Sequence, residues 1–221
     1  MPKFTPIYTG TLRSHSVTLP QCISECSGIR IFGRRIKSLA FSTDVAIIKN
    51  INADAIIAVY PFTPQPVISQ AIINVSDVPV FVGVGGGITT GARAIRLAIQ
   101  AEHQGAYGVV LNAPTANEVI HQIKEEVDIP VVITVVSEHT DIRARIEAGA
   151  DFLNVSGAAR TPEIVAHIRR QFPEVPIIAT GGPTDESILE TIRAGANAMT
   201  YTPPSNGELF AQLMEKYRET H

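Results

Sequence analysis

Two glycine-rich turns are the residues in this sequence best suited to binding chemistry. The run VPIIATGGPTDES, at 175–187, places Gly181 and Gly182 between a short apolar run and the start of a helix-like run. Backbone N–H groups at such a turn can bind an anion, and glycine lets the anion approach without a Cβ in the way. The sequence therefore predicts either a phosphate site at these glycines or a tight turn into a helix.

A second turn, GVGGGITTG at 83–91, repeats this arrangement with Gly85 and Gly86 after another apolar run. It is not a dinucleotide fingerprint, because Asn112 rather than an acidic residue ends the next apolar run. We expect Gly85 and Gly86 to contact a ligand, or to make room for a bulky one or for a tight turn. If both glycine turns bind, a ligand with two anionic ends would fit.

A small set of acid–base residues follows other apolar runs. His139 can give or take a proton near neutral pH, and the adjacent Glu138 could orient its ring. Asp44 is a third candidate, as a base or as a metal ligand. Each also has a structural alternative: His139 and Glu138 as exposed loop side chains, and Asp44 as an acid facing the positive end of a helix dipole.

Amides and hydroxyls at the ends of apolar runs form a third group. Asn112, Asn154 and Ser156 stand where inward-facing side chains would meet a ligand. Buried asparagines need hydrogen-bond partners, so we expect them to bind a ligand or to form a polar layer inside the protein. No lysine or cysteine stands at such an end as a nucleophile.

Eight short apolar runs must position these residues. Their continuous Val, Ile and Leu content is typical of parallel strands buried on both faces. Helix-length stretches with apolar residues at i, i+3 and i+4 spacing lie between them, such as the one carrying Ile142 and Ile146. The strands are predicted near 38–42, 55–60, 79–84, 107–112, 130–136, 152–156, 176–180 and 198–201.

Helix boundaries carry repeated signals. Glycine is predicted to end three helices, at Gly105, Gly149 and Gly195. Threonine hydroxyls are predicted to cap the helix starts, with proline in the first turn of two of them. The sites are Thr43-Asp44, Thr63-Pro64, Thr115, Thr140-Asp141, Thr161-Pro162 and Thr184-Asp185.

An internal repeat indicates the architecture. The segments that begin at Pro130 and Pro176 resemble each other, and the same offset of 46 residues separates Gly149 from Gly195. One period holds two strands and two helices, so four periods give eight strands and a closed (β/α)8 TIM barrel. An open doubly wound sheet is the alternative, but no switch point is evident. We expect the barrel at 37–221 and an N-terminal extension at 1–36 that packs on the barrel's lower end or forms an oligomer contact.

The segment GADFLNVSGAARTPEIVAHIRRQFPEVPIIATGGPTDESILETIRAGANAM, at 149–199, is similar to the C-terminal half of the phosphate-binding TIM barrels. That superfamily includes sugar-phosphate epimerases, thiamine-phosphate synthase and antiterminator-type regulators. The run 180–182, Thr-Gly-Gly, and the Ala-Gly-Ala at 194–196 most resemble the 2-keto-3-deoxy-phosphogluconate aldolases. The resemblance implies a phosphate site at Gly181 and Gly182, completed by a Gly-Ser or Gly-Thr pair after the last strand. The chain departs from the family there, because two prolines at 203–204 remove two N–H donors. Either the hydroxyls of Thr202 and Ser205 compensate for them, or the phosphate site is damaged.

The resemblance does not bring aldolase chemistry with it. The Schiff-base lysine of the aldolases lies on strand six, and the matching position here is Asn154. An amide nitrogen is not nucleophilic and cannot form an imine.

Composition narrows the remaining classes. The chain has 221 residues, 45% hydrophobic and 18% charged, which is typical of a globular protein with one large core. A net charge of −3 gives no reason to expect nucleic acid, so the basic residues at 30–37 are expected at the barrel's lower face or at a subunit interface. No apolar run approaches the roughly 20 residues that span a bilayer, and no signal peptide is evident. Cys22 and Cys26 are expected to be buried structural residues in a reducing cytoplasm.

We therefore expect a cytoplasmic enzyme that acts on a small phosphorylated or otherwise anionic metabolite. Isomerase or lyase chemistry by proton transfer fits its residues best, with His139, Glu138 and Asp44 moving protons. No metal or cofactor is predicted, although FMN is an alternative because these barrels also bind its phosphate. A non-catalytic ligand sensor is the competing hypothesis for function. Assembly into a homo-oligomer is a separate expectation.

Overall fold

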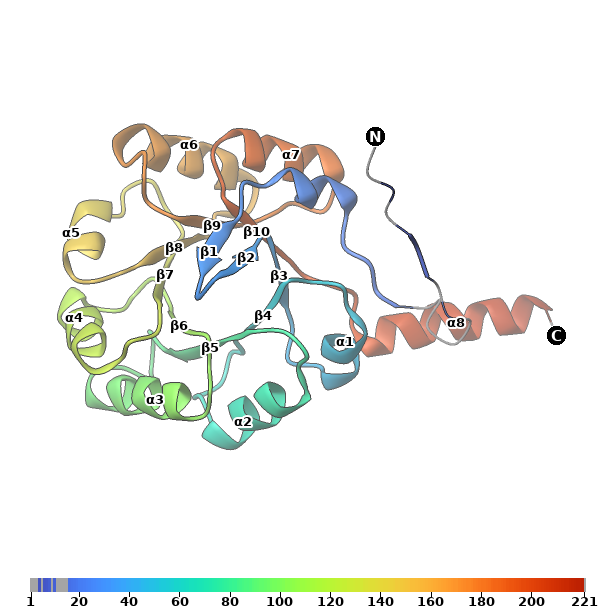
Figure 1. Ribbon diagram of the computed structural model, residues 1–221, viewed down its shortest axis with the longest axis horizontal. Coiled ribbons are helices and arrows are strands. Elements are labelled where there is room, and N and C mark those ends of the chain that lie inside the picture. Colours follow the sequence, from blue (N-terminus) through green and yellow to red (C-terminus); the bar gives the residue numbers. More distant parts are fainter. Residues whose placement is uncertain (1–3, 5, 9, 11–15, 221) are drawn as a thin grey trace.

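Eight parallel strands form the centre of the protein, whose computed structural model describes residues 4, 6–8, 10 and 16–220. The strands are β3 (Ser38–Phe41), β4 (Ala55–Ala58), β5 (Val80–Gly85), β6 (Gly108–Leu111), β7 (Val131–Val135), β8 (Phe152–Val155), β9 (Ile177–Thr180) and β10 (Ala198–Tyr201). They close into a barrel in the order β10-β3-β4-β5-β6-β7-β8-β9 (Figure 1). Each lies within two residues of its predicted range, and the predicted (β/α)8 TIM barrel is confirmed.

Helices alternate with the strands around the outside of the barrel (Figure 1). They are α1 (Val45–Asn50), α2 (Pro66–Val75), α3 (Ala92–His103), α4 (Asn117–Glu126), α5 (Ile142–Glu147), α6 (Thr161–Gln171), α7 (Asp185–Arg193) and α8 (Asn206–Thr220). One apolar cluster joins the strands to side chains such as Ile120 of α4 and Ile164 of α6, and a second cluster, including Leu39, Phe81 and Val132, fills the barrel. The strands are thus buried on both faces, which explains their continuous apolar runs.

A hairpin of the N-terminal extension covers the lower end of the barrel. Strands β1 (Ile29–Ile31) and β2 (Arg34–Ile36) pair antiparallel. Their isoleucines join the apolar cluster inside the barrel, and the Tyr107 hydroxyl donates to the Ile31 carbonyl over 2.7 Å. The expected cover is therefore formed by residues 29–36, with Arg30 and Arg35 on the exposed side of the hairpin. For residues 1–3, 5, 9 and 11–15 the expectation lies outside the described residues.

Most helices begin differently from the prediction. The side chains of Asp44 and Asp141 cap α1 and α5, and among the threonines only Thr184 caps its helix. The threonine-cap prediction is wrong for α2, α4 and α6, which begin without a side-chain cap. Two of the threonines have other partners, since Thr115 donates to the Asn112 carbonyl and Thr161 accepts from the Gly157 N–H.

The predicted helix ends are confirmed. The three glycines at 105, 149 and 195 have φ of +91°, +106° and +115°, in the left-handed region that favours glycine. The N–H of each donates to the carbonyl three residues earlier, over 2.9 to 3.0 Å.

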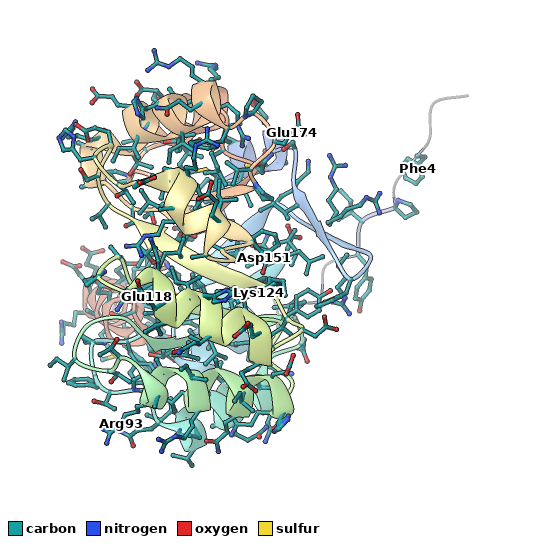
Figure 2. All side chains as sticks on the ribbon, turned by 90° about the vertical axis from the view of Figure 1, so that its left-hand side faces the viewer. Phe4, Arg93, Glu118, Lys124, Asp151 and Glu174 are labelled. Atoms are coloured by element: carbon teal, nitrogen blue, oxygen red, sulfur yellow. The ribbon has the colours of Figure 1, made fainter. Side chains whose placement is uncertain are left out.

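The internal repeat is a structural repeat at the lower end of the barrel. Lys124 lies over Gly149 and pairs with Asp151, which also accepts from the Val131 N–H (Figure 2). In the next unit Arg169 lies over Gly195 and donates to Asn197, which accepts from the Ile177 N–H. Each unit thus ties the start of one strand to the residue before the next strand.

The two cysteines are free, and their environments differ. Cys26 is buried, and desolvation raises the pKa of its thiol to about 11, as expected for an inert structural cysteine. Cys22 is partly exposed in the 3-10 helix η2 (Gln21–Glu25), so its expected burial is only partial.

Helix α8 projects away from the barrel (Figure 1). Phe210, Leu213 and Met214 are exposed on it. No described helix is long and apolar enough to cross a membrane. The homo-oligomer stays a prediction.

Candidate functional site

Four polar side chains lie inside the barrel near the carboxyl ends of consecutive strands. Thr134, Asn154, Thr180 and Thr200 come from β7, β8, β9 and β10. The residue two positions earlier in each strand belongs to the apolar cluster inside the barrel, and side chains two apart share a face. Strand register pairs Thr134 with Asn154 and Thr180 with Thr200. We call these four residues the polar layer, which lies above the apolar interior on one side of the C-terminal mouth.

Two atoms of the polar layer have no hydrogen-bond partner in the described part of the protein. Asn154 is 8% exposed, and its Nδ2 donates to Thr134 Oγ1 over 3.4 Å while its Oδ1 is unpartnered. Thr200 is 4% exposed, and its Oγ1 is also unpartnered. Whichever way the Asn154 amide is turned, one of its polar atoms lacks a partner. Buried polar groups normally find partners, so these two atoms indicate where a ligand would contribute hydrogen bonds.

The turn at Gly181 and Gly182 borders the polar layer. The Gly181 N–H donates to the Thr200 carbonyl over 3.3 Å. Two hollows of about 240 and 590 Å³ meet at this turn. Besides the glycines, Thr200 and Thr202 line the smaller hollow, and Ser156 and Thr180 line the larger. The predicted residues Ser156, Thr202 and the two glycines are thus brought together.

The N-terminus of α7, which follows this turn, is already capped. Thr184 and Ser187 form a capping box, in which each side chain accepts from the other's backbone N–H over 3.3 Å. Asp185 and Glu186 complement the helix dipole in the first turn. A Cβ on Gly182 would come within 2.3 Å of Ser187 Oγ, so this approach requires glycine. An anion here would use the Gly182 N–H rather than the capped helix end, because the Gly181 N–H donates to Thr200 and Pro183 has no N–H.

Ser205, a predicted phosphate-binding residue, makes its hydrogen bonds to Glu208 and not toward the turn at Gly181 and Gly182. Its N–H and its hydroxyl both donate to Glu208 Oε2 over 2.7 Å, at the start of α8. These hydrogen bonds hold the pKa of Glu208 below its usual range. Ser205 lines neither hollow. The Ser-x-x-Glu spacing at 205–208 is a capping-box signal that the sequence already carried.

The glycine turn after β5 borders a third hollow, of about 210 Å³. The Gly86 N–H donates to the Thr89 carbonyl over 2.8 Å, and the Asn112 N–H donates to the Gly85 carbonyl over 2.9 Å. The predicted ligand residues Gly85, Gly86 and Asn112 therefore lie together around one hollow. Because β5 and β9 are opposite each other in the ring, this hollow lies across the mouth from Gly181.

Glu138 and His139 follow β7. His139 is 87% exposed, and its Nε2 lies 3.7 Å from Glu138 Oε1. Arg160, in the 3-10 helix η3 (Ala158–Arg160), hydrogen-bonds to the same oxygen, and this bond is the main reason why the pKa of Glu138 is lowered. Glu138 Oε2 is buried and unpartnered within the described residues. Arg160 therefore favours the ionised form of the carboxylate, while the His139 ring lies in solvent.

Asp44 is positioned by its role as a helix cap. Its Oδ1 accepts from the N–H groups of Ala46 and Ile47 over 2.9 and 3.3 Å. Asp44, Glu138 and His139 line none of the three hollows described above. Most of the ligand-binding candidates thus line the hollows, whereas Asn154, Ser205 and the acid–base candidates do not. Within the described residues, no group of three or more His, Cys, Asp or Glu side chains could hold a metal ion.

Thr134 and Thr200 are members of the polar layer that the sequence analysis missed. Each is a single threonine inside an apolar strand, in VVITV and AMTY. The available signal was their position, two residues after an inward-facing apolar residue. Threonine is common in strands, so its type alone does not mark a site.

No protein-family model matches the chain. A curated protein, the thiamine-phosphate synthase of Geobacillus thermodenitrificans (strain NG80-2), is 36% identical over 78 residues. The match covers 29% of this chain and 35% of that enzyme, so the chain spans about a third of the relative's length.

Solved structures with the same fold have low sequence identity to this chain. A 2,3-dimethylmalate lyase, described as a PEP mutase/isocitrate lyase superfamily member, has a TM-score of 0.68 at 15% identity, covering 95% of this chain and 85% of its own. The phosphoenolpyruvate phosphomutase of Streptomyces platensis subsp. rosaceus has 0.62 at 14%, covering 89% and 83%. A phosphonopyruvate hydrolase in complex with oxalate and Mg²⁺ has 0.60 at 16%, covering 83% and 80%. These likenesses show a TIM barrel and do not place the chain among the aldolases or epimerases.

Proposed function

We propose that this protein is an enzyme that binds a small phosphorylated or otherwise anionic metabolite at the C-terminal mouth of its barrel. The observation that carries the proposal is the Thr200 hydroxyl, which is buried beside the turn at Gly181 and Gly182 and has no hydrogen-bond partner among the described residues. A hydroxyl and the N–H groups of a glycine turn are suitable donors for anionic oxygens.

The comparisons support this proposal in general terms. The similar barrels are named as a lyase, a phosphomutase and a hydrolase of a phosphonate, and the local sequence match is to a thiamine-phosphate synthase. Enzymes with this fold carry their active sites at the C-terminal face. The location of the polar layer agrees with that rule.

We propose isomerase or lyase chemistry by proton transfer. Glu138 is the candidate proton acceptor: Arg160 keeps it ionised, as an acceptor must be, although the lowered pKa makes it a weaker base. His139 would act beside it, and Asp44 is retained as the third candidate. Schiff-base chemistry is not proposed, because the residue that resembles the aldolase lysine position is Asn154, whose amide nitrogen cannot form an imine.

A ligand sensor in the cytoplasm is the second candidate function. The observation that favours it is the separation of the acid–base residues: His139 is in solvent and Asp44 caps α1. An FMN-dependent enzyme is a third, weaker proposal, which a yellow colour of the purified protein would support.

A thermal-shift screen with phosphorylated metabolites tests the binding proposal. A ligand that binds the folded state raises the melting temperature, by an amount that grows with its concentration relative to Kd. The variant Thr200→Val keeps the side-chain shape and removes the unpartnered hydroxyl. Ser38→Ala is the matched control, because Ser38 is a buried hydroxyl at the opposite end of the barrel that accepts from the Asp54 N–H.

We expect Thr200→Val to lose most of the ligand-induced shift, and Ser38→Ala to keep it. Equal shifts in both variants would contradict the site. Incubation of the protein with a ligand found in this way then distinguishes the two functions. An enzyme converts the ligand to a product, whereas a sensor leaves it unchanged.

A further inference from the structure

The glycines beside the hollow after β5 pack closely against neighbouring residues, and two of them leave no room for a Cβ. A Cβ on Gly83 would lie 3.1 Å from Val59 Cγ2, and one on Gly85 would lie 2.5 Å from the Thr89 carbonyl oxygen. A Cβ on Gly86 would meet Thr115 Oγ1 at 2.4 Å. Gly85 and Gly86 also have φ of +151° and +96°, which glycine adopts more readily than other residues. Close packing of the backbone beside the hollow therefore requires glycine at 85 and 86.

One part of the wall of this hollow is apolar and partly aromatic, and Thr63, Thr89 and Asn112 supply polar groups to the rest. Val59 and Val110 line it together with Tyr60, Phe62 and Ile88. The Tyr60 hydroxyl accepts from the Gln65 N–H over 2.8 Å, which fixes the ring in place. Among the residues that the structure describes, no charged side chain lines the hollow. The two glycine turns led us to expect a ligand with two anionic ends. This hollow offers no cationic side chain to bind the second of them.

Two large apolar side chains at this hollow are open to solvent. Phe62 is 73% exposed and Ile88 is 101% exposed. Both would lose apolar surface from water if a flat group lay between them, which is a favourable change. The hollow measures about 210 Å³, and an apolar cavity of about 150 Å³ is large enough for benzene.

We infer that this hollow, lined by Tyr60, Phe62, Ile88 and the glycines after β5, binds a flat, uncharged and largely apolar group, such as an aromatic ring. Asn112 and Thr89, which also line the hollow, would orient that group by hydrogen bonds. The inference rests on the proposed function in one respect: the ring belongs to the same ligand whose anionic end binds at Gly181 and Gly182. Opposite strands of an eight-stranded barrel lie roughly 15 Å apart, so the ligand must carry a spacer between its two ends.

The experiment uses the full chain and three probes: inorganic phosphate, benzyl alcohol and a series of phenylalkyl phosphates with spacers of about two to six carbons, chosen for the strand spacing. Phe62→Ser and Ile88→Ser remove exposed side chains, so the fold is retained. Val67→Ser is the matched control, since Val67 is 71% exposed on α2 and lies outside the hollow. Binding is measured by titration calorimetry and by NMR shifts of the Val110 methyl groups.

We expect the tightest-binding phenylalkyl phosphate to bind at least about fivefold more tightly than inorganic phosphate. Phe62→Ser and Ile88→Ser should each remove most of that gain without changing phosphate affinity, and Val67→Ser should change neither. The inference is overturned if the phenyl group adds no affinity, or if the two hollow variants bind like the control. If benzyl alcohol shifts the Val110 methyl groups while phosphate does not bind, the ring site stands and the proposed anion site fails. If phosphate binds in a Thr200-dependent way and neither phenyl probe does better, the proposed function stands and this inference fails.

Discussion

Asn154 and Thr134 face each other on neighbouring strands inside the barrel, and a single 3.4 Å hydrogen bond from Nδ2 to Oγ1 is the contact that the amide makes there. The other polar atom of the amide is buried without a partner in the described protein. The side chain is therefore suited to binding a ligand rather than to covalent chemistry.

Two substitutions at Asn154 should show how the free energy of unfolding depends on the polarity and charge of the side chain at this buried position. Asn154→Leu removes an unpartnered amide at similar volume, so the free energy of unfolding should stay within about 1 kcal/mol of the wild type. Asn154→Asp places a carboxyl in a site where desolvation raises its folded-state pKa above the unfolded value. The loss of stability should therefore be small near pH 4 and grow as the pH rises, by about 1.4 kcal/mol for each unit of pKa shift. Urea unfolding at several pH values measures this, and a pH-independent loss would contradict it.

The pKa of Glu138 should depend on Arg160. Arg160→Gln removes the hydrogen bond that mainly lowers that pKa, so the carboxyl should titrate closer to its ordinary range. A depressed carboxyl pKa contributes stability above the unfolded-state pKa, and this contribution is lost as the pH falls through the folded-state pKa. Carbon-13 NMR titration of the Glu138 carboxyl is the measurement. Glu163→Gln is the control, because Glu163 contacts Arg160 at 3.5 Å without contacting Glu138; an effect as large as that of Arg160→Gln would argue against the assignment.

His139→Ala should leave stability unchanged, within about 0.5 kcal/mol, because the imidazole is exposed. Its effect on turnover of an identified substrate then reports on chemistry alone. A large loss of kcat is expected if His139 transfers a proton. Unchanged turnover would remove His139 from the proposed mechanism.

Replacing the basic residue should lower the free energy of unfolding more in one unit of the structural repeat, at Arg169, than in the other, at Lys124. Arg169 donates to the carbonyls of Pro173, Val175 and Gly195 and to Asn197, whereas Lys124 pairs with Asp151 at a partly exposed position. We expect Arg169→Met to cost about 2–4 kcal/mol, because it leaves several carbonyls unpaired. Lys124→Met should cost about 1 kcal/mol or less. Urea denaturation compares the two, and equal losses would mean that the carbonyl contacts contribute little.

The sequence by itself determined the barrel. Continuous apolar runs occur where strands are buried on both faces, and a repeat of 46 residues requires paired βα units, so strand positions such as Ile177–Thr180 could be predicted closely. Glycine at 149 and 195 predicted helix ends, because the left-handed backbone there disfavours other residues. These features depend on local geometry or on which faces are buried, and both leave a periodic trace in the sequence.

Only the tertiary structure decided which side chains share a site. Asp44 became a helix cap and Ser205 bonded to Glu208, because nearby backbone and side-chain groups compete for the same polar atoms. Thr200 entered the candidate site although its residue type gave no signal, since the closure of β10 between β9 and β3 places its hydroxyl inside the mouth. The turn at Gly181 and Gly182 thus keeps its predicted importance, but its nearest partners come from a strand whose contribution depends on barrel closure rather than on any sequence pattern.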